Sequence, residues 1–237
     1  EKVIGYLGYL QGRAENNQNC YFDIFLEPDY NGNGYHLLLY EEMLKEAQAF
    51  NCKRLYMSIY EHENYDESKK LLVNNGFKND FRIRESSLDL SRVDLGQYAS
   101  LLEKLDQKGI RFYDARDELS MQQGHYEKLE ELKWTYEQDF PMPDGTTMTR
   151  FPFGQYMKYQ KLFEEQHYGI EIIAVDRDQY VGSTDIHIYP KSDPHKAWTG
   201  SLGVLRKYRR RGIATALKVK AFEKLREKGV KTVRTDN

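Results

Sequence analysis

The sequence contains few of the residues and patterns that mark several large classes of protein. Among its 237 residues there are two cysteines, Cys20 and Cys52, which are far apart and have no paired spacing. We therefore expect no disulfide framework and a location in the reducing cytoplasm. No apolar run approaches the roughly 20 residues of a membrane-spanning helix, so no membrane partner is expected. The formal net charge of -2 argues against a nucleic-acid partner.

Several kinds of reactive site are also missing from the pattern. The six histidines show no paired metal-ligand spacing, and we expect no metal site. Neither cysteine shows evidence of activation as a nucleophile, and no Walker or dinucleotide-binding glycine motif is present. The composition, 40% hydrophobic and 30% charged, is that of a globular protein with one or two domains.

The most informative stretch reads LGVLRKYRRRGIATALK, residues 202–218. Its apolar start predicts a strand, and a basic segment, residues 206–211, follows. Gly212 then opens a predicted helix, in which apolar residues recur at helical spacing as far as Leu225. At such a turn, free N–H groups and the positive end of the helix dipole attract phosphate, and arginines add charge-assisted hydrogen bonds. Taken for its charges alone, the basic segment is typical of a solvated surface.

The spacing Arg209-x-x-Gly212-x-Ala214, preceded by a strand that ends at Val204, resembles the acyl-CoA-binding motif of the GNAT superfamily of N-acetyltransferases. The resemblance implies that acetyl-CoA is the co-substrate. It implies that the strand end binds the thioester carbonyl and the pantetheine arm, and that the turn holds the pyrophosphate. The cofactor-binding residues implied by the resemblance are Leu202, Gly203, Val204, Arg209, Arg210, Arg211, Gly212, Ile213, Ala214, Thr215 and the strand-end Asn237. The alternative for Asn237 is a turn residue that ends the strand, with no role in binding.

The chain also contains a diverged repeat of this unit. Residues 25–34 align with residues 203–212, and the helix and strand that follow each segment match in length. We therefore predict an α/β (α+β) fold of two tandem GNAT-like domains. Each would have a mixed, mostly antiparallel central sheet flanked by helices, and both would be incomplete in this sequence. The predicted limits are 1–90 for the N-terminal domain, 91–109 for a linker helix and 110–237 for the C-terminal domain.

The first copy has lost the residues that would hold a phosphate. Asn31 stands where the second copy has Arg209, and His36 where it has Ala214. An asparagine has no charged fork for a phosphate. We therefore expect the first domain not to bind CoA and to have a structural or acceptor-positioning role. A closing strand of this domain is predicted over residues 81–88.

For catalysis, the resemblance implies direct attack by a neutral amine in a ternary complex. Some relatives carry an acid six residues before the strand-end valine, but here that residue is Trp198. Asp185 and His187, on the preceding predicted strand, are the candidates for a general base; both also suit a half-exposed strand, and a water chain is an alternative. A general-acid tyrosine would lie beyond Asn237.

The predicted function is therefore an acetyl-CoA-dependent N-acetyltransferase acting on a small-molecule or peptide amine, with the oligomeric state left open. The alternative is a non-catalytic acyl-CoA-binding sensor or partner module, which the missing acid at residue 198 favours. The proline-rich loop over residues 140–153 is expected to border the acceptor site, because the resembled family places the acceptor there.

Overall fold

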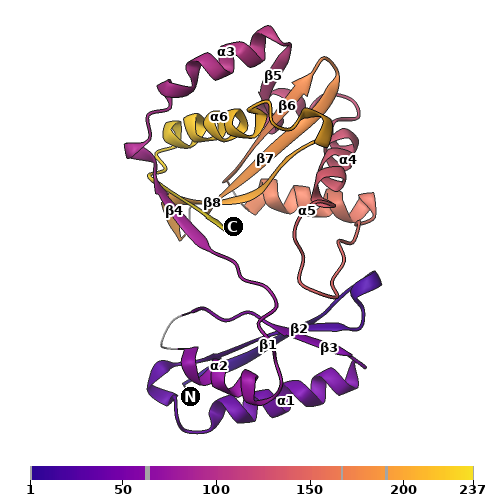
Figure 1. Cartoon of the computed structure of the whole chain (residues 1–237), viewed down its shortest axis with the longest axis vertical. Helices are drawn as coiled ribbons and strands as arrows, with labels where there is room; N and C mark the ends of the chain where they lie inside the picture. The colour runs from indigo at the N-terminus through magenta and orange to yellow at the C-terminus, as the bar shows by residue number, and fades with distance from the viewer. Residues whose placement is uncertain (1, 62–64, 167, 190–191, 237) are drawn as a thin grey trace. The chain divides into compact units, whose positions relative to one another are not determined.

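The computed structural model describes residues 2–61, 65–166, 168–189 and 192–236. The chain divides into two compact units, each with its own hydrophobic core (Figure 1). Unit 1 consists of residues 1–82 and 142–149, and unit 2 of residues 83–141 and 150–237.

Unit 1 is a three-stranded sheet with helices packed on one face. Its elements are β1 (Gly5–Gln11), β2 (Asn19–Leu26), α1 (Tyr35–Ala49), β3 (Arg54–Met57) and α2 (Asp66–Asn74). Strands β1 and β2 are antiparallel, and β2 and β3 are parallel. Because side chains alternate along a strand, Phe22 and Ile24 of β2 point to one face, where they pack with Met43 of α1 and Leu72 of α2.

A segment from far along the chain completes unit 1. Residues 142–149 belong to the loop expected at the acceptor site. Their backbone accepts hydrogen bonds from side chains of the first sheet: the amide of Asn19 and the guanidinium of Arg54 donate to Gly145 O, and Tyr56 Oη donates to Asp144 O. The 142–149 part of the proline-rich loop thus belongs to unit 1 and is held there by polar contacts.

Unit 2 contains a six-stranded sheet in the order β4-β9-β8-β7-β6-β5. Its strands are β4 (Glu85–Asp89), β5 (Ile110–Asp114), β6 (Tyr168–Asp176), β7 (Gln179–Tyr189), β8 (Asp193–Val204) and β9 (Thr232–Asp236), and its α-helices are α3 (Ala99–Gln107), α4 (His125–Glu137), α5 (Phe153–Gln166) and α6 (Ile213–Glu227). Neighbouring strands are antiparallel except β8 and β9, which are parallel.

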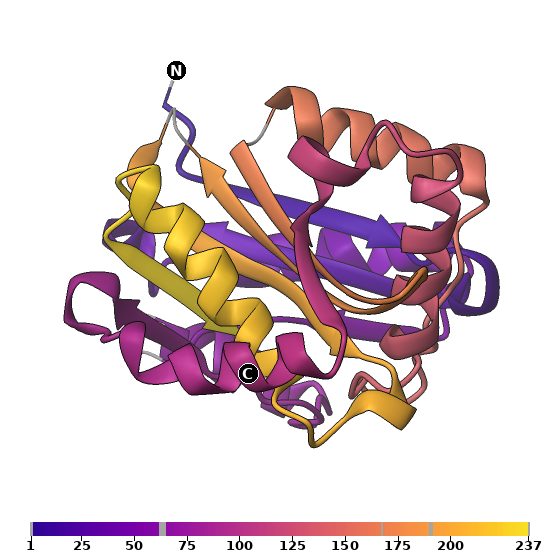
Figure 2. The same ribbon diagram turned by 90° about the horizontal axis from the view of Figure 1, so that it is seen from above.

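Helices cover both faces of this sheet. Along β6, Ile170 and Ile172 belong to the core that α6 covers, whereas Ile173 belongs to the core that α4 covers. The alternation of side chains along a strand explains this division. Figure 2 shows α6 lying across the strands of the sheet. The predicted site residues of β7 and β8 therefore lie in strands that are packed between two layers of helices.

The strand expected to close the first sheet lies elsewhere. It runs from Glu85 to Asp89 and pairs antiparallel with β9 of unit 2, from Glu85 opposite Asp236 to Asp89 opposite Thr232. The prediction of a closing strand for the first copy is therefore wrong. Its sequence, ESSLD, has a single apolar residue, and all five residues are exposed. The strand therefore shows no alternation of apolar and polar residues that would assign it to one sheet.

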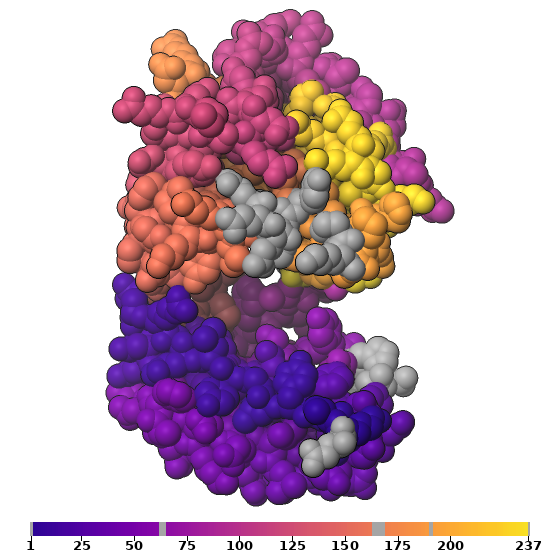
Figure 3. Space-filling model, turned by 180° about the vertical axis from the view of Figure 1, so that it is seen from behind, coloured from indigo at the N-terminus to yellow at the C-terminus, as the bar shows by residue number. Residues whose placement is uncertain are grey.

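The helix expected between the copies is α3, and it packs in unit 2. Its Leu105 is buried in the core formed with α6. Figure 3 shows the magenta residues of this part of the chain beside the yellow residues of the C-terminal part, in agreement with the α3–α6 packing and the β4–β9 pairing.

The predicted fold class is confirmed: the chain is a mixed α/β protein with two sheets flanked by helices. Among the helices of the described residues, none has the length and apolar character needed to cross a membrane.

Candidate active site

The predicted phosphate turn lies between β8 and α6. After Val204 the chain makes a short 3-10 turn, Arg206–Tyr208, and Gly212 is the residue before the first turn of α6. Gly212 has φ of +86° and Arg210 has φ of +62°, both in the left-handed region. A side chain at residue 212 would be strained in this conformation and would also meet Leu101. The glycine therefore lets the backbone turn sharply and leaves the first N–H groups of α6 open to a ligand.

The strand end and the turn form the wall of one cavity of about 440 Å³. Of the predicted cofactor residues, those that line it are Leu202, Gly203, Val204, Arg209, Arg210, Gly212, Ile213, Ala214 and Thr215. Tyr136, Asp139, Phe140 and Tyr208 complete the lining. One end of the cavity is thus basic and rich in backbone N–H groups, and the other is apolar.

Among the described residues, the predicted cofactor residue Arg211 does not line this cavity. The Arg211 guanidinium donates to Lys207 O at 2.9 Å and lies 5.0 Å from the centre of the Tyr208 ring. These contacts hold its side chain against the turn. Asn237 lies outside the described residues, so its predicted role stays a prediction.

Strands β8 and β9 separate beside the cavity. Their parallel pairing joins Lys196–Trp198 to Thr232–Arg234, and within the described residues it stops there, although β8 continues to Val204. The edge of β8 after Trp198 therefore has backbone groups that β9 does not use. An extended ligand with amide groups can pair with such an edge.

An acidic side chain neutralises part of the basic end. Asp139 forms ion pairs with the guanidinium groups of Arg206 and Arg209. Their hydrogen bonds hold the pKa of the Asp139 carboxyl well below its usual range. Arg209 Nε also donates to Val204 O at 2.9 Å, which ties the turn to the strand end. The arginine of the motif is thus oriented before any ligand is bound.

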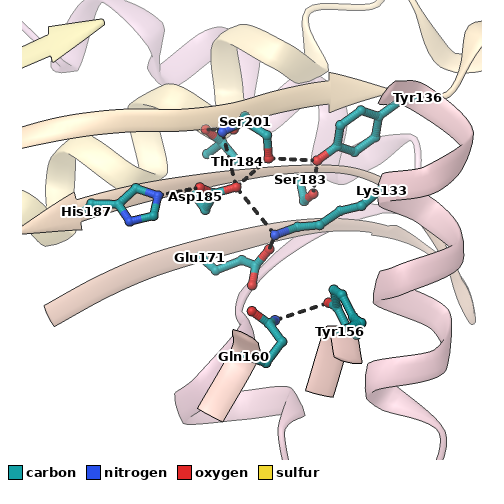
Figure 4. A network of polar contacts seen from close by, with 10 residues as sticks. All are labelled: Lys133, Tyr136, Tyr156, Gln160, Glu171, Ser183, Thr184, Asp185, His187 and Ser201. Carbon is teal, nitrogen blue, oxygen red and sulfur yellow. Dashed lines mark hydrogen bonds and ion pairs between the residues drawn. The ribbon is translucent and has the colours of Figure 1, made fainter. Parts of the chain in front are cut away.

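A buried polar network includes Tyr136, one of the residues that line the cavity (Figure 4). Lys133 Nζ of α4 lies 2.7 Å from Glu171 Oε1 of β6 and 3.4 Å from Asp185 Oδ1 of β7. Asp185 also accepts hydrogen bonds from the N–H and hydroxyl of Ser201 on β8. Its other oxygen lies 3.0 Å from His187 Nε2. The structure therefore brings the two predicted catalytic residues, Asp185 and His187, into direct contact.

The protonation of this network follows from its contacts. Burial alone would raise the pKa of Asp185, but the Lys133 ammonium and the hydrogen bonds from His187 and Ser201 outweigh it and hold this pKa well below its usual range. Burial likewise opposes the charge of Lys133, and Glu171 and Asp185 more than compensate, so the pKa of Lys133 is raised. Asp185 is thus an ionised acceptor, and a carboxylate of low pKa is a weak general base.

Tyr136 connects the network to the cavity. Its ring lines the cavity, and its hydroxyl lies 3.1 Å from Ser183 Oγ and 3.0 Å from Ser201 Oγ. Burial raises the pKa of Tyr136 to about 12, against the opposing effect of Lys133. The phenol is therefore neutral at physiological pH.

The sequence patterns did not point to Lys133, Tyr136 or Glu171. Glu171 interrupts an apolar strand, Ile170–Ile173, and a charge inside such a strand is a usable signal for a buried ion pair. Lys133 and Tyr136 lie in a helix with many charged and aromatic residues, so nothing in the helical pattern distinguishes them. Within the described residues, no group of three or more His, Cys, Asp or Glu side chains is arranged to hold a metal ion.

Comparison with known proteins identifies the family. The sequence matches the acetyltransferase (GNAT) family over residues 1–77 and 128–237. The chain belongs to the GNAT acetyltransferase family. Acyl-CoA-dependent acetyl transfer is the general activity of GNAT proteins, and this chain is therefore an acetyltransferase by family. No curated protein sequence matches it.

Solved structures agree with the tandem GNAT fold. A tandem GNAT protein from the clavulanic acid biosynthesis pathway has a TM-score of 0.70 at 18% identity, and the match covers 100% of this chain and 71% of that one. A GNAT protein from Sphaerobacter thermophilus has a TM-score of 0.65 at 19% identity, covering 99% and 67%. The glucosamine N-acetyltransferase region of a fungal multi-domain β-N-acetylglucosaminidase has a TM-score of 0.72 at 14% identity, covering 98% and 28%. This GNAT chain thus spans less than a third of the fungal protein.

Proposed function

We propose that unit 2 binds acetyl-CoA in the cavity between β8 and α6 and transfers the acetyl group to an amine by direct attack in a ternary complex. The acceptor is a small molecule or a peptide. The observation that carries this proposal is the cavity itself, in which the basic turn and the apolar strand end meet.

The two ends of the cavity suit the two ends of the donor. The open N–H groups at the start of α6 and the Arg209 guanidinium suit the pyrophosphate, because both supply hydrogen bonds to anionic oxygens. The unpaired edge of β8 suits the amide groups of the pantetheine arm. The thioester would then lie beside Gly203 and Tyr136, at the apolar end.

His187 is the general base of this proposal, and Asp185 positions it. The acceptor amine attacks the thioester carbonyl carbon, so a C–N bond forms, the C–S bond breaks and the CoA thiolate leaves and is protonated. The amine loses its proton to the His187 imidazole through water, because the register sets Ser183 opposite Gly203 and His187 further along, opposite Trp198. An imidazole suits this step near neutral pH, and the ionised Asp185 fixes the ring through Nε2.

Unit 1 does not hold CoA in this proposal. At its corresponding turn, Gly32 N already donates to Glu67 Oε2 at 2.9 Å, so a carboxylate occupies the place of a phosphate oxygen. Phe25 stands where the aligned strand of unit 2 has Gly203. Unit 1 fixes the 142–149 segment instead, and the two free thiols it contains suit a reducing cytoplasm.

Calorimetric titration with acetyl-CoA tests the proposal. We expect one site per chain. Arg209→Ala should weaken binding by about 10- to 100-fold, because charge-assisted hydrogen bonds contribute about 1.5–3 kcal/mol each. The matched control is Asn31→Ala, at the aligned turn of unit 1, which should bind like the wild type. Absence of binding by the wild type would reject the proposal, and two sites per chain would reject the assignment of unit 1.

The second candidate function is a non-catalytic acyl-CoA-binding module. It is favoured by Trp198, which occupies the strand position where some relatives carry an acid and pairs with His187 across the sheet. A thiol-release assay with acetyl-CoA and a panel of amines separates the two. Release of CoA that depends on an amine and is lost in His187→Gln, with acetyl-CoA binding retained, supports the enzyme.

A further inference from the structure

We propose that the phenol ring of Tyr136 limits the length of the acyl group, so that the donor site takes an acetyl group in preference to longer chains. This inference rests on the proposed binding of acyl-CoA in the cavity of unit 2. It names a specificity-determining residue for the donor.

The ring is packed directly against the strand that would carry the thioester. Tyr136 is in the last turn of α4 and is 1% exposed. A Cβ atom added at Gly203 would collide with the Cγ and Cδ atoms of this ring. Tyr136 and Leu202 line the same cavity, so the ring forms part of its apolar end. An acyl chain that extends from a thioester at Gly203 would therefore meet the ring.

The ring cannot easily turn aside. The α4 backbone holds one end of the side chain, and the hydroxyl at the other end is bonded to Ser183 and Ser201, on two neighbouring strands. The Phe140 ring packs against it with a centroid separation of 5.8 Å and also lines the cavity. Displacing the phenol would break two buried hydrogen bonds and this aromatic contact.

Beyond the ring lie buried charges rather than an apolar channel. Ser201 Oγ contacts both the Tyr136 hydroxyl and Asp185 Oδ1, and Asp185 is paired with Lys133 (Figure 4). An alkyl tail placed there would remove solvent from these charges and replace none of their hydrogen bonds, which is unfavourable. Both the ring and the charges thus oppose a long acyl group, whereas a short one ends before it reaches them.

Binding of CoA thioesters of increasing chain length tests the inference without an acceptor. The probes are CoA, acetyl-CoA, butyryl-CoA and octanoyl-CoA, titrated by calorimetry into the full chain. We expect the wild type to bind butyryl-CoA and octanoyl-CoA at least about tenfold more weakly than acetyl-CoA, as overpacking of a filled site predicts. Tyr136→Ala and Tyr136→Leu should bring butyryl-CoA within about threefold of acetyl-CoA, whereas the longer octanoyl tail still meets the buried charges and should stay weaker. Tyr136→Phe loses the two hydrogen bonds of the hydroxyl but keeps the ring and its contact with Phe140, so butyryl-CoA should stay more than about threefold weaker than acetyl-CoA.

Each outcome decides one question. No binding of CoA or acetyl-CoA by the wild type would reject the proposed function and this inference with it. Equal binding of all chain lengths by the wild type would reject the inference alone. If both ring-removing variants lose CoA binding while circular dichroism shows them folded, Tyr136 supports the site as a whole and the inference is wrong. A ratio that changes equally in Tyr136→Phe would assign the effect to the hydroxyl and also reject the role of the ring.

Discussion

Replacing Lys133 with methionine should lower the free energy of unfolding by about 3–5 kcal/mol at pH 7, the usual cost of breaking a buried ion pair. The Lys133 side chain is 15% exposed, and its ammonium lies 2.7 Å from Glu171 Oε1 and 3.4 Å from Asp185 Oδ1. Methionine has a similar length and no charge. It would fill the space and leave two carboxylates buried without a cation.

The cost should depend on pH in a definite direction. In the wild type the pKa of Asp185 is depressed, so its stabilising contribution is present above its unfolded value of about 3.9 and is lost only as the pH falls through the folded value. Burial already raises the pKa of Glu171 in the wild type. Without the Lys133 ammonium, which lowers both values, the pKa of each carboxyl rises relative to the wild type. The two ionised carboxylates then destabilise the folded variant most at pH 7, and this destabilisation decreases as acid protonates them. The difference between wild type and variant should therefore shrink from pH 7 to pH 5.

Urea denaturation at pH 7 and pH 5 measures this difference. The matched control is Lys158→Met, an exposed lysine of α5, which should change the unfolding free energy by less than about 0.5 kcal/mol at either pH. A penalty for Lys133→Met that stays the same at both pH values would show that the methylene packing of the side chain, and not its charge, is what matters. A penalty below about 1 kcal/mol would refute the burial of the pair.

Three further predictions follow from other contacts. Gly203→Ala should force the Tyr136 ring to move and destabilise the protein by about 1–3 kcal/mol, measured by thermal denaturation; an unchanged Tm would contradict the close packing seen there. Asp139→Asn should strengthen CoA binding by about two- to fivefold in calorimetry, because Arg206 and Arg209 lose an internal competitor for phosphate, and weaker binding would show that Asp139 orients them instead. Burial, followed by the neighbouring Cys52, raises the pKa of the Cys20 thiol to about 11, so at pH 8 a disulfide reagent should modify Cys20 only after unfolding.

Local patterns sufficed to predict the strand, turn and helix of residues 202–227. The apolar run, the glycine and the helical spacing all lie within one short segment, and each has a local physical meaning. Strand pairing is a long-range property, and it is where the prediction failed. Nothing in Glu85–Asp89 indicates that it pairs with β9, about 150 residues further along the chain.

The same limit applies to the site. Asp185 and His187 could be selected from the sequence because they share one strand, two residues apart, and therefore one face. Lys133 and Glu171 come from a helix and another strand, so only the fold brings their charges to Asp185. The two cysteines are a further case: they are distant in the sequence, but their thiols are neighbours in unit 1.

The two aligned turns show how a backbone conformation differs from a binding site. Gly34 and Gly212 have φ of +79° and +86°, and each precedes the first residue of a 15-residue helix. In unit 1 the turn is closed by the Glu67 carboxylate, which accepts from Gly32 N. In unit 2 the turn opens into a cavity, with Arg209 beside it. The dipole and the free N–H groups are common to both, so the neighbouring charge decides which turn can receive a phosphate.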